Sequence, residues 1–221
     1  MTTTLTRILI NPQRRQARKL LTNPQAMHAA VRATFPPDIE QEDARVLWRV
    51  DHRGHEHVLY VVGPERPDAT GLVEQAGWAT RPAQTAEYTR FLAALKKGQR
   101  WHFELVANPV MSKAGERGTR GKVVPHVTPE QQLDWLIKKS VNAGFSVAGS
   151  GEDGEGLPTA RVVERANLRF RRRDRTVTVR TARFDGVLEV TDADALRSTL
   201  VHGLGKAKAY GCGLLTLAQP H

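Results

Sequence analysis

A glutamine, a histidine and an arginine share one face of a helix that the sequence predicts near the N-terminus. Gln25, His28 and Arg32 are three and four residues apart, so their side chains project from the same side of a helix. An imidazole titrates near neutral pH, and a guanidinium one turn away can neutralise a phosphate. This set could transfer protons in phosphodiester chemistry, although a lone surface histidine is more often simply solvated.

A second candidate site is a segment rich in glycine and lysine between residues 203 and 213. Glycine lets the backbone approach a ligand closely, and lysine attracts phosphate. The spacing matches neither a Walker loop nor a dinucleotide-binding fingerprint. A glycine-rich connection before an edge strand is the alternative. The candidate ligand-binding residues of this segment are Gly203, Gly205, Lys206, Lys208 and Gly211.

Basic residues are concentrated in two segments of a chain whose formal net charge is +10. Nine arginines and only two acids lie between residues 161 and 183, and a smaller basic group lies between residues 7 and 19. This concentration favours binding to a polyanion such as nucleic acid, with a solvated, nonspecific strand pair as the alternative. The candidate contacts are Arg14, Arg15, Arg161, Arg165, Arg169, Arg171, Arg172, Arg173 and Arg175.

Other chemistries are weakly supported. His52, His55 and His57 flank a predicted turn without supporting carboxylates, and the single cysteine, Cys212, has no paired histidine and excludes an internal disulfide. We therefore expect no metal site and no small-molecule cofactor. The sequence shows no secretory leader and no apolar run approaching the ~20 residues that cross a bilayer. We expect a soluble, cytoplasmic protein with no membrane partner.

The elements that position these residues predict an α+β protein of two tandem ferredoxin-like (RRM-like, βαββαβ) domains, over residues 1–88 and 89–221. An Asn-Pro pair ends the first strand of each half, which supports the repeat. Loops are expected at 112–122 and 149–156. The first half reads as strands at 5–10, 45–50, 57–62 and 78–84 and helices at 23–34 and 68–76. The second half reads as strands at 100–107, 160–171, 176–190 and 212–218 and helices at 128–143 and 192–201.

These features together resemble the CRISPR-associated repeat endoribonucleases, most closely the type I-E crRNA-processing subunit of Cascade (CasE family). The resemblance is carried by Asn23-Pro24 and Met27-His28 on the first helix and by the glycine- and lysine-rich segment. It implies metal-independent cleavage of CRISPR repeat RNA at the 3′ base of its stem-loop. The 2′-OH attacks the phosphorus in such a reaction, leaving a 2′,3′-cyclic phosphate and a 5′-OH.

The resemblance also implies roles and partners. His28 would act as general base or general acid, Arg32 or a nearby lysine would stabilise the phosphorane, and the arginine-rich strands would grip the RNA stem. The partners would be the repeat RNA hairpin, as pre-crRNA and crRNA, and the Cascade backbone subunits, with the protein remaining on its product.

One position departs from the family pattern. Relatives often carry a tyrosine where this chain has Gln25, and an amide can hydrogen-bond a phosphate oxygen but cannot exchange a proton usefully. We therefore expect Gln25 to position rather than to react. A noncatalytic RNA-binding module of the same architecture is the first alternative. A DNA-binding or ribosome-associated basic protein is the second, if the C-terminal match is coincidental.

Overall fold

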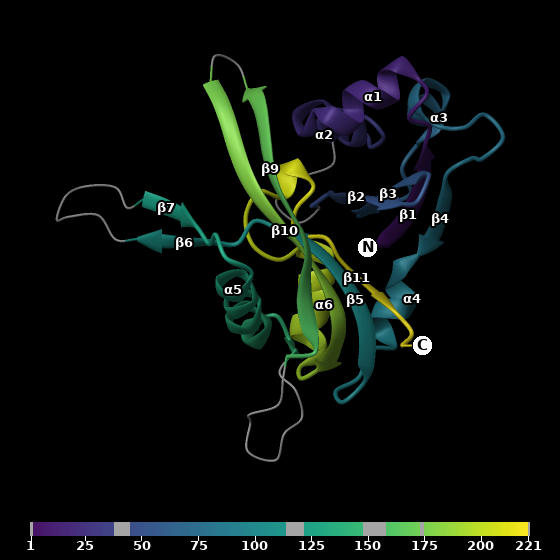
Figure 1. Ribbon diagram of the computed structural model, residues 1–221. Coiled ribbons are helices and arrows are strands. Elements are labelled where there is room, and N and C mark those ends of the chain that lie inside the picture. Colours follow the sequence, from purple (N-terminus) through teal and green to yellow (C-terminus); the bar gives the residue numbers. More distant parts are fainter. Residues whose placement is uncertain (1, 38–44, 114–121, 148–157, 173–174, 221) are drawn as a thin grey trace, which may run out of the picture.

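The computed structural model describes residues 2–37, 45–113, 122–147, 158–172 and 175–220. Two antiparallel sheets, one from each half of the chain, form its framework together with flanking helices (Figure 1). Arg173, the loop predicted at 149–156 and most of the loop predicted at 112–122 lie outside the described residues.

The first half forms a four-stranded sheet in the order β2-β3-β1-β4. Three helices cover one face, because Ile8 and Ile10 of the sheet pack against Leu20, Met27 and Leu72 of the helices. The elements are β1 (Thr4–Ile10), α1 (Arg15–Thr22), α2 (Pro24–Arg32), β2 (Leu47–Arg53), β3 (Glu56–Gly63), α3 (Thr70–Ala76) and β4 (Gln84–Glu87).

The second half forms a sheet in the order β11-β5-β10-β8, and the long strand β9 pairs with β10. The elements are β5 (Arg100–Ala107), α5 (Pro129–Asn142), β8 (Phe145–Ser146), β9 (Ala160–Arg172), β10 (Arg175–Val190), α6 (Ala193–His202) and β11 (Leu215–Ala218). The remaining elements are α4 (Tyr88–Ala93), β6 (Val110–Lys113), β7 (Lys122–Pro125) and the 3-10 turn η1 (Lys208–Tyr210).

The strand order confirms the predicted fold class. In the first half β1 lies between β4 and β3, with β2 beyond β3. In the second half β5 lies between β11 and β10, and β9 pairs with β10. Both are the ferredoxin-like arrangement. The domain boundary at residues 88 and 89 stays a prediction. None of the helices in the described ranges combines the length and apolar character that crossing a membrane requires.

Some local predictions are wrong. The strand expected at 78–84 is β4 at Gln84–Glu87, because residues 78–83 form a tight connection in which Trp78 and Arg81 make an isolated bridge. The last strand begins at Leu215 rather than at 212. The sequence predicts no element in the basic segment before Asn23, which forms helix α1 and buries Ala17 and Leu20 on its inner face.

The uncovered face of the first sheet packs against the second half. Leu47 and Val62 belong to the same buried cluster as Phe103, Leu105 and Leu215. The two halves are therefore joined by a continuous apolar core rather than by a linker alone.

A buried ion network reinforces this junction. Arg49 is 1% exposed, and its Nε and Nη2 each donate to the Asp51 carboxylate at 2.7 Å. Its Nη1 donates to the carbonyls of Glu104 and Leu214 at 2.7 and 3.0 Å, and Arg183 Nη1 donates to Asp51 Oδ1 at 2.8 Å. Side chains of β2 are thereby bonded to β5, β10 and the residue before β11, which fixes how the two halves meet.

Candidate functional site

The start of helix α2 and its buried face together determine on which side of the helix His28 lies. The Asn23 side chain accepts hydrogen bonds from the backbone N–H groups of Gln25 and Ala26 at 3.0 and 3.2 Å, and Pro24 occupies the first helical position. Met27 and Val31 are buried against the sheet. Gln25, His28 and Arg32 are left half-buried on the other side of the helix.

His28 and Arg32 line an open hollow of about 490 Å³ whose opposite wall is the glycine- and lysine-rich segment. Arg45 and Val46, just before β2, complete the wall together with Gly205, Lys206, Ala207, Lys208 and Ala209. The turn η1 packs directly against α2 and β2. The structure therefore brings together the two motifs that the sequence singles out at opposite ends of the chain.

The environment of His28 favours its uncharged ring. Its Nδ1 is buried and has no hydrogen-bond partner among the residues that the structure describes. Burial lowers the pKa of His28 below its usual 6.5, and the positive charges of Arg32 and Arg172 lower it further. A neutral imidazole carries a ring nitrogen that can accept a proton at neutral pH.

Arg172 reaches this site from the far half of the chain because of the alternation of strand β9. Phe170 packs against Tyr210, with ring centroids 4.7 Å apart, and Leu168 contacts the same cluster. Arg172 has the same parity as these residues and therefore faces α2, which β9 contacts. The sequence predicts Arg172 as an RNA contact, but only the pairing of the two halves places it beside His28.

The glycines of the C-terminal segment are required by protein packing. Gly203, Gly205 and Gly211 have φ values of +77°, +80° and +79°, which L-residues rarely adopt. A Cβ at these positions would lie 2.9, 3.1 and 2.7 Å from Leu47, Trp135 and Trp48 side chains, respectively. The space beside each of these glycines is filled by a protein side chain. The hollow is lined from this segment by Gly205, Lys206, Ala207, Lys208 and Ala209. A role of the three glycines in RNA binding stays a prediction.

The remaining predicted arginines occupy different environments. Arg161 pairs with Asp185 at 3.2 Å and Arg165 donates to the Val127 carbonyl at 3.1 Å, both toward the base of the β9–β10 hairpin. Arg169, Arg171 and Arg175 are exposed toward its tip. Arg183, one of the nine clustered arginines, forms an ion pair with the buried Asp51.

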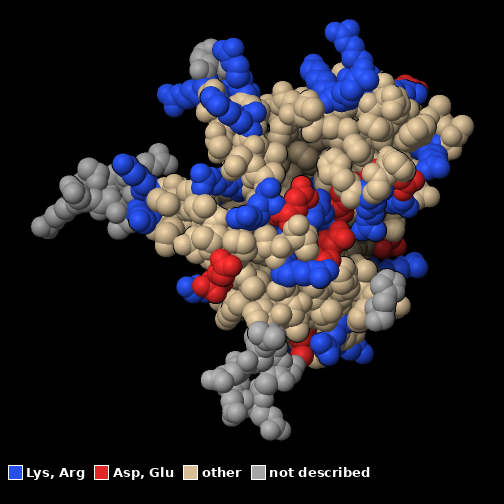
Figure 2. Space-filling view, viewed as in Figure 1, with Lys and Arg blue, Asp and Glu red and all other residues tan. Residues whose placement is uncertain are grey.

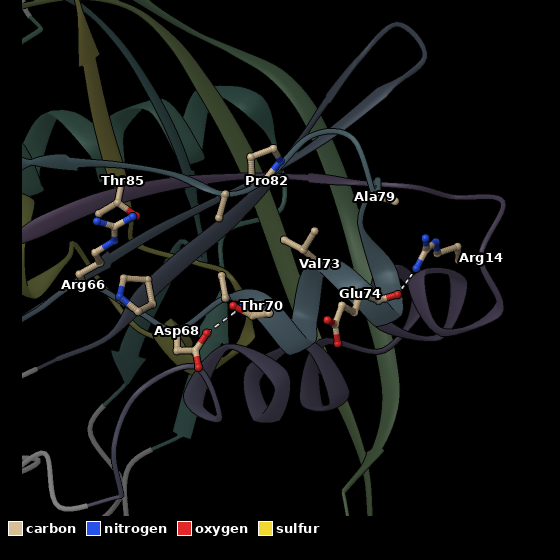
Figure 3. A pocket seen from close by; sticks show the side chains of 12 residues that line it. Arg14, Arg66, Asp68, Thr70, Val73, Glu74, Ala79, Pro82 and Thr85 are labelled. Atoms are coloured by element: carbon tan, nitrogen blue, oxygen red, sulfur yellow. Dashed lines mark hydrogen bonds between the residues drawn. The ribbon is translucent and has the colours of Figure 1, made fainter.

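Arg14 lies away from His28. Its guanidinium donates to the Glu74 carbonyl at one end of a separate hollow of about 810 Å³, which α3 and the segments flanking it line (Figure 3). Arg15 is exposed in the first turn of α1. The structure thus does not bring Arg14 into the hollow that contains His28.

The charge distribution of one face agrees with this division. Figure 2 shows basic side chains gathered beside the tip of the β9–β10 hairpin and on the helices across from it, with a hollowed surface between them. Most of the acidic side chains visible on this face lie below the hollowed surface. The hairpin tip and the helices therefore form the two positive walls of a groove.

The other candidate chemistries gain no support. The His52 and His57 rings contact edge to face at 4.5 Å, and within the described ranges no three or more histidine, cysteine or carboxylate side chains are grouped as metal ligands. Burial raises the pKa of the Cys212 thiol to about 12, so the reactive thiolate is not populated at neutral pH.

The chain matches known proteins along nearly its whole length. Residues 4–219 match the family described as CRISPR associated protein. The CRISPR-associated endoribonuclease Cse3 of Thermus thermophilus is 34% identical over 222 residues, covering 97% of this chain and 99% of that protein. The Cascade subunit CasE of Escherichia coli is 28% identical over 131 residues, covering 56% of this chain and 60% of that protein.

Solved structures show the same similarity over the whole chain. Thermus thermophilus Cse3 bound to an RNA representing a pre-cleavage complex superposes with a TM-score of 0.82 at 33% identity, covering 99% of this chain and all of that one. Escherichia coli Cas6e superposes with a TM-score of 0.60 at 23% identity, covering 98% of this chain and all of that one, which supports the fold alone.

Proposed function

The chain belongs to the CRISPR associated protein family, and on this premise we propose that it is the endoribonuclease that matures CRISPR RNA. It cleaves repeat RNA at the 3′ base of the stem-loop, by attack of the 2′-OH on the adjacent phosphorus. The products are a 2′,3′-cyclic phosphate and a 5′-OH. The observation that carries this proposal is the hollow in which His28, Arg32 and the lysines of the C-terminal segment meet.

Residues of the hollow, together with Gln25 and Arg172 from outside its lining, have the chemistry that this reaction needs. The neutral ring of His28 can accept or relay a proton, and the low pKa that burial, Arg32 and Arg172 give it keeps that form dominant at pH 7. Arg32, Arg172 and Lys206 are cations placed to offset the negative charge that develops on the phosphorane. Gln25 lies on the same helix face and positions the substrate through its amide.

The reaction requires no metal ion in this proposal, because RNA supplies its own nucleophile. The 2′-OH is held next to the scissile phosphorus by the ribose itself, so the protein has only to orient it and move protons. Cleavage in the presence of a chelator follows from this chemistry.

The arginine-rich hairpin supplies the binding surface for the RNA stem. A-form RNA hides its base edges in a deep major groove, so exposed arginines at the hairpin tip contact phosphates and read shape. The Thermus relative has been solved with bound RNA, and the Escherichia coli relative is a Cascade subunit. We extend both partners to this chain: the repeat hairpin, which it retains after cleavage, and the Cascade backbone subunits.

The test is single-turnover cleavage of a labelled repeat hairpin in EDTA, with the wild type beside His28→Ala. We expect the wild type to release a product ending in a cyclic phosphate, and His28→Ala to be slower by about 10²–10⁴-fold, the range for loss of a proton-transfer group. Binding affinity of both proteins for the uncleaved hairpin is the control.

Each other outcome has a definite meaning. Tight hairpin binding without cleavage by either protein would favour a noncatalytic RNA-binding module. Gln25, which stands where relatives often carry a tyrosine, is the reason to consider that alternative. Equal cleavage by both proteins would keep the nuclease and remove His28 from its chemistry. A preference for duplex DNA of equal length would overturn both RNA functions.

A further inference from the structure

We propose that Lys208 is the general acid of the cleavage reaction, protonating the 5′-oxygen as it leaves, while His28 is the general base. This inference rests on the proposed function and divides the proton transfers between two side chains. It gives Lys208 a different role from Lys206, its neighbour in the same segment, which acts as a phosphate-binding cation.

The position of Lys208 makes it a partner for His28. Lys208 opens the turn η1, which packs against helix α2, and both side chains line the same hollow. Ala207, immediately before it, has φ +61° and ψ +29°, a left-handed conformation that a non-glycine residue keeps only where its surroundings hold it there. The backbone that carries Lys208 is therefore fixed in the wall facing His28.

Elimination among the lining residues leaves few other proton donors. The titratable side chains around the hollow are His28, Arg32, Arg45, Lys206 and Lys208. Arginine stays protonated throughout the useful pH range and is a poor acid. His28 cannot accept the 2′-OH proton and at the same moment protonate the leaving oxygen from the same nitrogen, and the amide of Gln25 cannot donate a proton usefully.

The two lysines differ in their surroundings. Lys206 is exposed, and its Nζ lies 3.4 Å from Ser112 Oγ in β6. Lys208 is half-buried and packs its stem under the Gly213 backbone. Burial lowers the pKa of Lys208 below its usual 10.5, and the charge of Arg45 lowers it further. A less basic ammonium is a stronger acid, which suits Lys208 better than Lys206 to proton donation.

The groups facing Lys208 are mostly positive. Helix α2 contributes His28 and Arg32, the segment before β2 contributes Arg45, and β9 directs Arg172 toward the same helix. In the described part of the chain no carboxylate forms an ion pair with Lys208. The surroundings therefore favour loss of the Lys208 proton once a negative leaving oxygen is present to receive it.

The step balances in atoms and charge. The 2′-oxygen forms its bond to phosphorus as its proton passes to Nε2 of His28, because Nδ1 is buried. The bond between phosphorus and the 5′-oxygen breaks, and that oxygen takes a proton from Lys208 Nζ. The enzyme is left with a protonated His28 and a neutral Lys208, which return to their starting states by exchanging one proton through solvent.

The experiment compares two hairpin substrates under single-turnover conditions. One carries the natural 5′-oxygen at the scissile bond and the other a 5′-bridging sulfur, which leaves as a thiolate and needs no general acid. We expect Lys208→Ala to cut the oxygen substrate about 10²-fold or more slowly than wild type, and to cut the sulfur substrate within about tenfold of wild type. Lys208→Arg keeps the charge but should remain slow on the oxygen substrate.

Matched variants separate this role from simple charge or folding effects. Lys206→Ala should slow both substrates by the same factor, because it weakens phosphate contact only. His28→Ala should stay slow on both, because a base is needed whichever atom leaves. Thermal unfolding of each variant shows whether it is folded.

Failure of this inference is distinguishable from failure of the proposed function. If the wild type does not cleave the hairpin, the nuclease itself is wrong. If the wild type cleaves and Lys208→Arg restores the rate, or the sulfur substrate does not rescue Lys208→Ala, then Lys208 is a phosphate-binding cation and the general-acid role is overturned.

Discussion

At the scale of single residues, the site depends on a histidine whose surroundings keep it uncharged. Partial burial removes water from the His28 ring, and two arginines oppose its protonation from different elements, Arg32 from α2 and Arg172 from β9. A fully solvated histidine is about half protonated at pH 6.5, and the protonated fraction cannot act as a base. Desolvation and positive neighbours therefore widen the pH range in which His28 is available as a base.

This predicts the titration of His28 in the RNA-free protein. We expect its midpoint below 6.5, and we expect Arg172→Ala to raise it toward 6.5, because one cause of the lowered pKa is removed. NMR of the imidazole carbon-bound protons across pH 4–9 measures both. Arg171→Ala is the control, because its side chain lies on the opposite face of the strand. Equal shifts in both variants would contradict the placement of Arg172 beside the ring.

At the scale of elements, the β9–β10 hairpin combines an apolar anchor with a charged tip. Phe170 and Val179 of the hairpin pack against Cys212 of the C-terminal segment. This small cluster holds the hairpin against the rest of the protein. Arg169 and Arg171 project from the outward face of β9 and are exposed. Arg161 lies roughly 33 Å from Arg171 along the same strand, at about 3.3 Å per residue, and is paired with Asp185.

The hairpin predicts that its arginines differ in their contribution to RNA binding. Replacing Arg169 and Arg171 by glutamine should weaken hairpin binding and reduce the slope of log affinity against log salt by roughly 1.4–1.8, since each lost phosphate contact removes about 0.7–0.9. Arg161→Gln should change the slope less, because its charge is already paired. Fluorescence anisotropy between 50 and 300 mM salt measures both slopes. A larger change for Arg161→Gln would place the RNA at the base of the hairpin.

At the scale of the whole molecule, the site exists only while the two halves keep their relative position. His28 belongs to the first half, whereas Lys206, Lys208 and Arg172 belong to the second. The buried Asp51 lies between the halves and is bonded by Arg49 and Arg183. Burial by itself would raise the pKa of Asp51, but the hydrogen bonds and charges of these two arginines outweigh it and lower the pKa from 3.8 to about 2.

This lowered pKa predicts how stability depends on pH. A carboxyl whose pKa falls from 3.8 to about 2 on folding contributes about 2 kcal/mol at pH 7, present above its unfolded pKa and lost as pH falls through the folded one. Asp51→Asn should therefore lower the free energy of unfolding by about 2–4 kcal/mol at pH 7, since two arginines lose their partner. The deficit should shrink below pH 4.

Urea unfolding at pH 7 and at pH 3 measures this difference. Glu189→Gln is the control, because Glu189 is exposed, and we expect a change within about 0.5 kcal/mol. An Asp51→Asn deficit that stayed the same at both pH values would show that the ionised carboxylate is not what stabilises the junction.

The sequence alone determined the features that depend on local order. The Asn-Pro start and the three- and four-residue spacing of Gln25, His28 and Arg32 require only that one helix forms, and the helix is there. Alternating and β-branched runs likewise predict the long strands at 160–171 and 176–190, and the repeated strand–helix pattern predicts two ferredoxin-like units. Charge and glycine content marked the hairpin and the C-terminal segment as candidates for binding.

Tertiary structure alone decided which of these candidates meet. The proximity of His28 to Lys208 and Arg172 follows from the packing of two sheets and a buried ion network, and no local periodicity encodes contacts between residues so far apart in the chain. The same packing pairs Arg183, one of the nine clustered arginines, with the buried Asp51, and turns Arg14 toward Glu74. A sequence pattern fixes the face of an element on which a side chain lies, whereas the partner that this face meets is set by long-range packing.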